Sequence, residues 1–337
     1  FNYFKSIEID LLPVLIDMQF NGIFIDKEYL ENRSLDIGKK IDALEIEIID
    51  LAGENFNLNS SQQLAVILFD KLQLPMVKKR STAEAVLKEL KQKHPLPELI
   101  LNYRKLYKLK NTYLDPLPSN IVPVTDRVHS SFNQTMTATG RLSTSNPNFQ
   151  NIPIRTEDGK EIRKAIKAQS NDYQIFSADY SQVELRVMAH LSGDESLIAA
   201  LNNGEDIHTF TAKNIFNVED DDQVLPEMRR IAKIVNFGIM YGAGPFRLSQ
   251  ELDVPFGEAK KIKDAYFDKY KGIEQYIENS KIQIKDSKSV ETLLGRKRAV
   301  WDSDSQNKIR RDAAERMAIN MPIQGTAAEM IKLAMIK

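Results

Sequence analysis

The stretch PEMRRIAKIVNFGIMYGAG (226–244) has apolar residues at the spacing of an amphipathic helix. At about 100° per residue, one side of this helix carries two cations followed by two aromatic rings: Arg229, Lys233, Phe237 and Tyr241. The other side carries apolar residues that we expect to pack: Ile231, Ile234, Val235 and Ile239. The first side suits a nucleoside triphosphate that lies along the helix, with its phosphates on the cations and its base on Phe237. Spacing alone favours a simpler alternative, an amphipathic helix whose basic edge is solvated.

Upstream of this helix, SADYSQVELR (177–186) places one carboxylate, Asp179, at the end of an apolar run. We expect that run, YQIFSADY (173–180), to form a short buried strand that is followed by a helix. Asp179 is then either the N-cap of that helix or an oxygen ligand for a magnesium ion. Because two-metal phosphoryl transfer needs more than one carboxylate, this acid alone does not make a metal site.

Downstream, the largely apolar stretch ERMAINMPIQGTAAEMI (315–331) carries Arg316, Asn320 and Gln324 four residues apart. This spacing predicts that the three side chains share one face of a helix. An internal polar stripe with satisfied hydrogen bonds is the common outcome of such a pattern. The alternative is contact with the DNA minor groove, which presents acceptors at similar positions in all base pairs.

Three other polar residues are candidates for binding. Asn148 and Gln150, in NPNFQN (146–151), have the same amide chemistry as Asn320 and Gln324. Among the four histidines, we single out His208, in GEDIHTFTA (204–212), as a donor to a phosphate. The sequence contains no P-loop, no zinc-ligand spacing and no Ser-His-Asp order.

Composition limits the class of protein. A chain of 337 residues predicts two or three sub-domains. The absence of cysteine excludes disulfides and thiolate zinc sites, and no apolar run approaches the roughly 20 residues of a membrane span. We therefore expect a cytoplasmic protein without a membrane partner. The net charge of -1 argues against a dedicated DNA-binding domain, but residues 281–311 hold nine Lys or Arg against four acids. That excess indicates either a solvated basic face or a groove that follows phosphates.

The chain changes character at about Arg127. The first 120 residues are almost wholly helical in pattern, with prolines between the helices. After Arg127, short strand-like segments and a polar loop come first, and helices separated by Gly and Pro follow. We expect an α+β protein that is mostly helical, with a small antiparallel sheet.

Taken together, the motifs resemble the family A DNA polymerases of the bacterial DNA polymerase I type. SADYSQVELRVMAHLSGD (177–194) resembles motif A of that family, MRRIAKIVNFGIMYG (228–242) its motif B, and TATGRLSTSNPNFQNIP (137–153) its primer-binding segment. The resemblance implies a right-hand fold. Its parts are a linker from an upstream exonuclease-like domain with the start of the palm (1–59), the thumb (60–125), the palm with motif A (126–194), the fingers with motif B (195–300) and an incomplete return to the palm (301–337).

The resemblance also implies residue roles for a DNA-templated DNA polymerase of replication and repair. Asp179 and the carbonyl of Tyr180 are the implied ligands of two Mg²⁺ ions, and Lys233 is the implied proton donor to pyrophosphate. The implied deoxynucleoside triphosphate site comprises Gln182, Glu184, His208, Arg229, Lys233, Phe237 and Tyr241. The implied contacts with the primer-template duplex are Arg141, Asn148, Gln150, Arg310, Arg316, Asn320 and Gln324. We expect a monomer.

Two alternatives to this function remain. The second metal-binding acid of the family lies in a VHDE-like motif C. In the family, that motif follows the helix that AEMIKLAMI (328–336) resembles, and the sequence up to Lys337 does not contain it. We therefore expect this chain to hold half of the metal site, and a non-catalytic fragment that binds primer-template is the alternative. A relative of the single-subunit RNA polymerases would share the metal chemistry. However, the resemblance places Glu184 in the space that a ribose 2′-OH needs, and this disfavours ribonucleotides.

Overall fold

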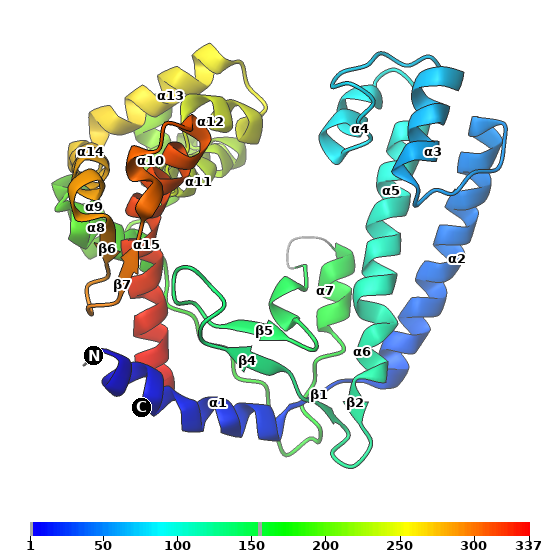
Figure 1. Cartoon of the computed structure of the whole chain (residues 1–337), viewed down its shortest axis with the longest axis horizontal. Coiled ribbons are helices and arrows are strands. Elements are labelled where there is room, and N and C mark those ends of the chain that lie inside the picture. The colour runs from blue at the N-terminus through cyan, green and yellow to red at the C-terminus, as the bar shows by residue number, and fades with distance from the viewer. Residues whose placement is uncertain (1–2, 154–156) are drawn as a thin grey trace. The chain divides into compact units, whose positions relative to one another are not determined.

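The computed structural model describes residues 3–153 and 157–337, and these fall into two compact units (Figure 1). Unit 1 comprises residues 1–16, 133–143 and 178–337, and unit 2 comprises residues 17–132 and 144–177. Both units are mainly helical, and the strands of the described residues pair in small antiparallel sheets. The short sheet of β4 (Ser131–Asn133) and β5 (Ser143–Ser145) lies where the chain passes from one unit to the other.

Unit 1 holds most of the sequence motifs. Its elements, in chain order, are η1 (Phe4–Ile9), the start of α1 (Asp10–Asn21), α8 (Val183–Ser192), α9 (Glu195–Asn202), α10 (Ile207–Phe216), η5 (Asp221–Gln223), α11 (Pro226–Met240), α12 (Pro245–Leu252), α13 (Phe256–Lys269), α14 (Lys271–Ser287), β6 (Ser289–Glu291), β7 (Lys297–Ala299), η6 (Trp301–Asp304) and α15 (Lys308–Ile336). The core of the unit joins these helices through buried aliphatic side chains such as Leu185, Ile207 and Val235.

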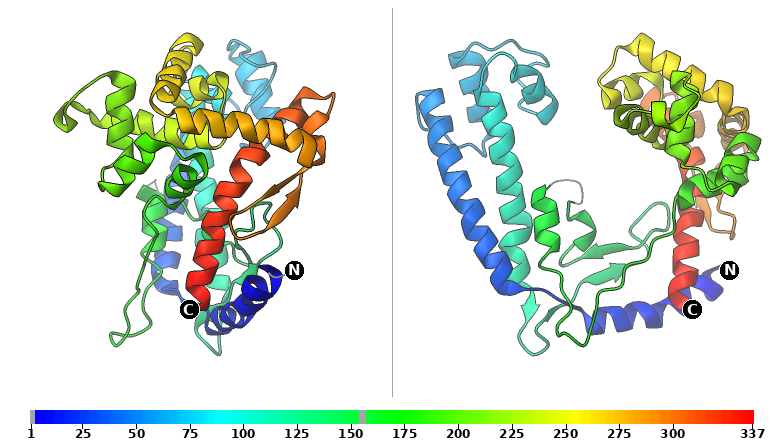
Figure 2. Two further views of the ribbon diagram at one scale, coloured as in Figure 1. Left: turned by 90° about the vertical axis from the view of Figure 1, so that its left-hand side faces the viewer. Right: turned by 180° about the vertical axis from the view of Figure 1, so that it is seen from behind.

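The β6–β7 hairpin lies beside α15 in every view (Figure 2). Its register pairs Val290 with Arg298. A second, smaller core forms here, because Val300 packs with Ile284 of α14 and with Ala314 of α15. The long helix α15 therefore packs against both α14 and the hairpin.

Unit 2 is built on two long helices. Its elements are β1 (Ile23–Phe24), α2 (Lys27–Ala52), α3 (Ser61–Ala65), η2 (Val66–Lys71), α4 (Glu84–Leu90), α5 (Leu96–Leu109), η3 (Lys110–Leu114), α6 (Pro116–Ser119), β2 (Ile121–Val122), β3 (Arg127–Val128), η4 (Phe149–Asn151) and α7 (Glu157–Arg163). Asp26 begins α2 by accepting a 2.9 Å hydrogen bond from the N–H of Tyr29. Gly53 ends it in the left-handed region, at φ 69°.

The packing of unit 2 confirms the helical pattern of its sequence. On α2, Leu30, Ile37 and Ile48 are buried at helical spacing, and α5 packs against this side. The three-stranded sheet has the order β1-β3-β2, and Val128 of the central strand pairs with both Ile23 and Ile121.

The prediction of a buried strand over residues 173–180 is wrong. These residues are extended without regular structure, and the exposed fractions of Phe176 and Ile175 are 90% and 56%. A strand needs a neighbour to pair its N–H and C=O groups. In the part of the chain that the structure describes, the strands pair as β1-β3-β2, β4-β5 and β6-β7, and none of them pairs with this segment. The apolar composition of residues 173–180 therefore predicted a strand for which the described residues provide no neighbouring strand.

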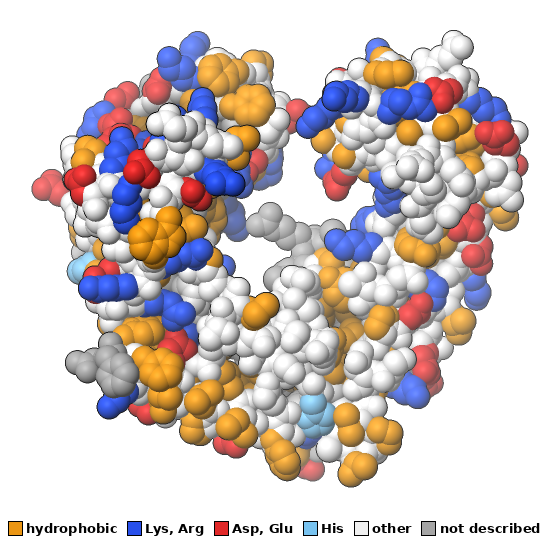
Figure 3. Space-filling model, in the orientation of Figure 1, with side chains coloured by type: hydrophobic (Ala, Val, Ile, Leu, Met, Phe, Trp, Pro, Cys, Tyr) orange, Lys and Arg blue, Asp and Glu red, His pale blue; other side chains and the backbone are white. Residues whose placement is uncertain are grey.

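The surface contains apolar side chains, but the described residues contain no helix suited to a bilayer. Apolar side chains lie along η1 and α1, where Phe4, Leu12 and Ile16 are more than two-fifths exposed (Figure 3). Within residues 3–153 and 157–337, every helix is too short or too polar to cross a membrane.

Candidate functional site

Helix α11 presents the face that its sequence predicts. Pro226 stands in its first turn, where a missing N–H costs nothing, and Glu227 follows it. Val235 and Ile239 are fully buried against α10 and α12, whereas Ile231 and Ile234 are only partly buried. The opposite side carries its charged and aromatic residues in the expected order: Arg229 and Lys233, both exposed, and then Phe237 and Tyr241, both half-buried.

His208 of α10 lies beside the basic end of this face. Its ring stands 5.7 Å from the ring of Phe237, centroid to centroid. Burial lowers the pKa of His208; Asp206 opposes that change, and the charges of Arg229 and Lys233 add to it. The two cations therefore lie within electrostatic range of a histidine whose pKa burial lowers, and all three groups are chemically able to donate to a phosphate.

Asp206 is a neighbour of Arg229 that the sequence did not reveal. Its carboxylate caps α10 by accepting from the N–H of Thr209 and forms a 2.5 Å ion pair with Arg229. Burial acts to raise the pKa of Asp206, but the guanidinium of Arg229 and the N–H of Thr209 outweigh it, so this pKa is lowered. An Asp directly before a helical pattern is an N-cap signal, so the cap was predictable, whereas its contact with α11 was not.

Glu184 joins three distant segments at the aromatic end of the face. It lies in the first turn of the helix that follows Asp179, α8, and it is buried. Its carboxylate accepts hydrogen bonds from the guanidinium of Arg141 and from the phenol of Tyr241. Burial raises the pKa of Tyr241 to about 12, and the charge of Glu184 adds to that effect. The phenol therefore stays protonated and is a permanent donor to Glu184.

The polar row of α15 meets the end of α11. The amide of Asn320 donates to the carbonyl of Tyr241 across 3.3 Å, and Gln324 is hydrogen-bonded to the hydroxyl of Tyr241. The backbone of Gly242 approaches Arg316 so closely that a Cβ on this glycine would lie 3.0 Å from the Cγ of Arg316. The structure thus brings Arg316, Asn320 and Gln324 together with Tyr241. Arg310 lies apart from this group, exposed in the first turn of α15.

The candidate magnesium site centres on Asp179 and Tyr180. Asp179 and Tyr180 lie exposed in the extended segment before α8. The N-cap alternative for Asp179 is excluded, because α8 begins after Gln182, which has φ 53° and makes no side-chain cap. A carboxylate and a carbonyl are oxygen ligands that Mg²⁺ accepts. However, among the residues that the structure describes, no three His, Cys, Asp or Glu side chains gather as a metal site.

Asn148 and Gln150 belong to unit 2 and are exposed. The side-chain oxygen of Asn148 accepts from the N–H of Gln150 and from the hydroxyl of Thr144, each at 3.0 Å. The side-chain oxygen of Gln150 accepts from the N–H of Thr144 at 3.1 Å. These bonds fix the two side chains on the loop that begins η4.

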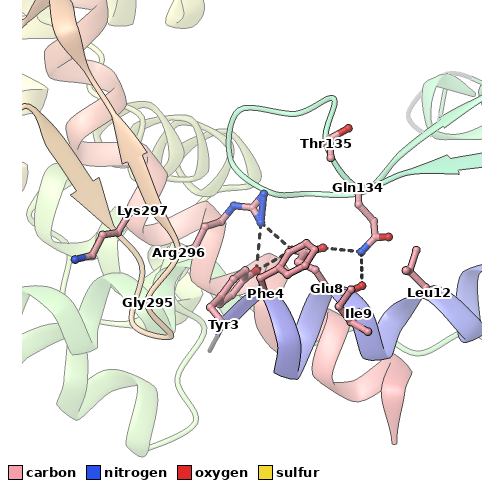
Figure 4. Close-up of a pocket in the computed structure, with 10 residues that line it drawn as sticks. All are labelled: Tyr3, Phe4, Glu8, Ile9, Leu12, Gln134, Thr135, Gly295, Arg296 and Lys297. Carbon is pink, nitrogen blue, oxygen red and sulfur yellow. Dashed lines mark hydrogen bonds and ion pairs between the residues drawn. The ribbon is translucent and has the colours of Figure 1, made fainter. Parts of the chain in front are cut away.

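Unit 1 also contains a charged cluster that the sequence did not indicate. A pocket of about 610 Å³ is lined by η1, by Gln134 and by the turn before β7 (Figure 4). In its wall, the buried carboxylate of Glu8 accepts from Gln134 at 2.6 Å, from Arg296 at 2.8 Å and from Lys332 at 2.6 Å. Because the protein itself satisfies this carboxylate, we interpret the cluster as structural.

Comparison with known sequences identifies the family. The sequence model described as "DNA polymerase family A" matches residues 27–337, which is most of the chain. The chain belongs to DNA polymerase family A. The resemblance in motifs A and B is thereby confirmed as a family relationship.

Relatives within family A match the chain over nearly its whole length. It is 49% identical over 99% of its length to "DNA polymerase I, thermostable" of Thermus thermophilus, and 46% identical over 98% to "DNA polymerase I" of Geobacillus stearothermophilus. The chain spans 40% and 38% of these two proteins.

A solved structure confirms the fold class. The POL domain of Pol1 from M. smegmatis, in complex with DNA primer-template and dNTP, matches with a TM-score of 0.91 and 39% identity. That match covers 98% of this chain and 59% of the other. The predicted α+β class and right-hand polymerase fold are therefore confirmed.

Proposed function

We propose that this chain is the polymerase region of a DNA-directed DNA polymerase, which adds deoxynucleotides to a primer 3′-OH in replication and repair. The observation that carries the proposal is the face of α11, where Arg229 and Lys233 stand beside His208 and lead to Phe237 and Tyr241. Family membership supports it, as does the similarity to the M. smegmatis POL domain, which was solved with DNA primer-template and dNTP.

In this proposal the triphosphate lies against Arg229, Lys233 and His208, and the base lies against Phe237 and Tyr241. The two cations offset the phosphate charge, and the neutral N–H donor adds a hydrogen bond. The half-buried rings can stack with any of the four bases. Gln182 and Glu184 border the sugar. Tyr241 and Arg141 hold Glu184 in place. In this proposal, Glu184 fills the space that a ribose 2′-OH would need.

The reaction forms a bond between the primer 3′ oxygen and the α-phosphorus, breaks the bond between that phosphorus and the leaving pyrophosphate, and releases the proton of the 3′-OH to solvent. Lys233 donates a proton to the pyrophosphate as it leaves. Asp179 and the carbonyl of Tyr180 would hold Mg²⁺, with two ions in the complete site, and the ions would neutralise the phosphate charge. The donor chemistry of these two groups fits Mg²⁺.

The duplex binds, in this proposal, through amide and guanidinium groups. Those of unit 1 are Arg141, Arg310, Arg316, Asn320 and Gln324, and those of unit 2 are Asn148 and Gln150. Minor-groove contact gives affinity that is independent of sequence. We also propose the thumb, palm and finger boundaries predicted above, and a monomeric protein.

A primer-extension assay with Mg²⁺ tests the proposal on this chain, together with the affinity for primer-template measured by fluorescence anisotropy. Extension by the chain, abolished in Asp179→Asn, supports a polymerase. Because the described residues contain no group of three His, Cys, Asp or Glu side chains that could hold a metal ion, a non-catalytic fragment that binds primer-template is the second candidate. Tight binding of primer-template without any extension would favour that candidate.

A further inference from the structure

Asn236 is a buried amide within the apolar side of α11. Its exposed fraction is 1%, and it directly precedes Phe237. Asn is unfavourable within a helix, and a buried amide costs free energy unless its hydrogen bonds are made. The neighbours Val235 and Ile239 show that an aliphatic residue packs readily on this side. An amide at this buried position therefore needs hydrogen-bond partners.

The amide serves His208 and Thr211 of α10. Its nitrogen lies 3.1 Å from Nδ1 of His208 and 3.1 Å from the hydroxyl of Thr211. Thr211 is in turn 2.8 Å from the hydroxyl of Tyr270, and both residues are fully buried. An amide nitrogen can only donate, so Nδ1 of His208 must accept. In a neutral imidazole the proton then resides on Nε2.

The surroundings of His208 keep the ring neutral. The residue is 5% exposed, and burial lowers its pKa. Three charged groups face it: Asp206 of the loop before α10, which raises the pKa, and Arg229 and Lys233 of α11, which lower it. A neutral ring with one fixed nitrogen has a single donor left.

We propose that Asn236 is a positioning residue that fixes His208 as the Nε2–H tautomer, so that this histidine offers an N–H donor to the triphosphate. The inference rests on the proposed function, because that function supplies the triphosphate. Asn236 itself touches no substrate in this arrangement and acts through His208. Its anchor is the pair Thr211 and Tyr270, which ties the amide to α10 and to the start of α14.

The tautomer can be measured in the free protein by ¹⁵N NMR of the histidine rings. The chain has four histidines, and His208→Gln assigns the signal of interest. We expect an unprotonated Nδ1 and a protonated Nε2 at pH 7. Asn236→Asp has the same shape but a carboxylate that only accepts, so it should place a proton on Nδ1. A protonated Nδ1 in the unaltered protein, or an unchanged spectrum in Asn236→Asp, would overturn the proposal.

Thr211→Val is the matched control, because it removes a partner of Asn236 and leaves the contact with His208. We expect it to keep the Nε2–H tautomer. An equal change of tautomer in this variant would contradict the assignment to Asn236. Since these measurements use neither DNA nor nucleotide, their failure is distinguishable from a failure of the proposed function.

The affinity for dATP, measured on the chain bound to a dideoxy-terminated primer-template, tests the consequence. Asn236→Leu and His208→Gln should each weaken dATP by on the order of tenfold, the effect of one hydrogen bond to a charged group. In the double variant the losses should not add, because Asn236 acts through His208. Additive losses, or an affinity that neither single variant changes, would overturn the proposal.

Discussion

Lys233 stands one helical turn after Arg229 on α11, and both lie near the buried ring of His208. The helical period alone placed these cations in one row, because a residue four positions on returns to the same side. The partner of Arg229 was not predictable in this way. Asp206 caps another helix, and only the packing of α10 on α11 brings it within 2.5 Å of Arg229.

Lys233→Ala should slow the chemical step of nucleotide addition by on the order of 10²-fold or more, as the removal of a general acid or a charge stabiliser does. The measurement is a single-turnover rate on an extension-competent polymerase that contains this chain. Lys260→Ala, which removes an exposed lysine of α13, is the matched control and should leave the rate unchanged. An unaltered rate in Lys233→Ala would exclude this lysine from the chemistry.

Glu184→Ala should raise the incorporation of ribonucleotides relative to deoxynucleotides on the order of 10- to 100-fold, because the carboxylate no longer fills the space of a 2′-OH. Competition between the two nucleotides in primer extension measures this ratio. Tyr241→Phe keeps the carboxylate and removes only the phenol that donates to it, so its effect should be smaller. Equal discrimination in Glu184→Ala and the unaltered protein would contradict the role of a sugar gate.

Among the elements, the helices were more predictable than the strands, although the strand-like pattern after Arg127 does contain β3 and β4. On α2 and α11 the apolar period repeats over several turns, so the buried side is marked many times in the sequence. The strands of the described residues have two or three residues each, too few to show an alternating period. Residues 173–180 had the apolar composition of a buried strand, but pairing depends on a neighbour that composition does not reveal.

The junction of α11 with the following turn depends on Gly242. Its φ is 74°, and an added Cβ would lie 3.0 Å from Arg316 of α15. Gly242→Ala should therefore lower the free energy of unfolding by about 1–2 kcal/mol and weaken primer-template binding by displacing Arg316. Gly244→Ala is the matched control, because Gly244 has φ -81° and open space around its Cα. Thermal denaturation and anisotropy should separate the two variants, and equal behaviour would refute the close approach.

At the scale of a whole unit, the cluster around Glu8 joins residues that are far apart in the sequence. Glu8 of η1 meets Gln134, Arg296 near β7 and Lys332 of α15. No local period or motif links these four residues, because each lies in a different segment of the sequence. Only the complete packing of unit 1 brings them together, so the sequence does not reveal this buried ionic cluster.

Removal of the charge of Glu8 should destabilise unit 1 strongly. Glu8→Gln leaves the ammonium of Lys332, which is 1% exposed, without its carboxylate, and the loss of one partner of a buried pair costs about 3–5 kcal/mol. Burial acts to raise the pKa of Glu8, but Lys332, Gln134 and Tyr3 lower it below its ordinary value of 4.5. The contribution of Glu8 is therefore complete above about pH 4.5 and is lost as the pH falls through the lowered pKa.

Urea unfolding of Glu8→Gln and of the unaltered protein, measured across this range, tests the argument. The difference in unfolding free energy should be largest at pH 7 and should shrink in acid, because protonated Glu8 and Gln are then both neutral. Glu251→Gln breaks an exposed pair with Arg247 on α12 and should cost no more than about 1 kcal/mol. A difference for Glu8→Gln that is small at pH 7, or that does not change in acid, would show that the cluster does not hold η1 to α15.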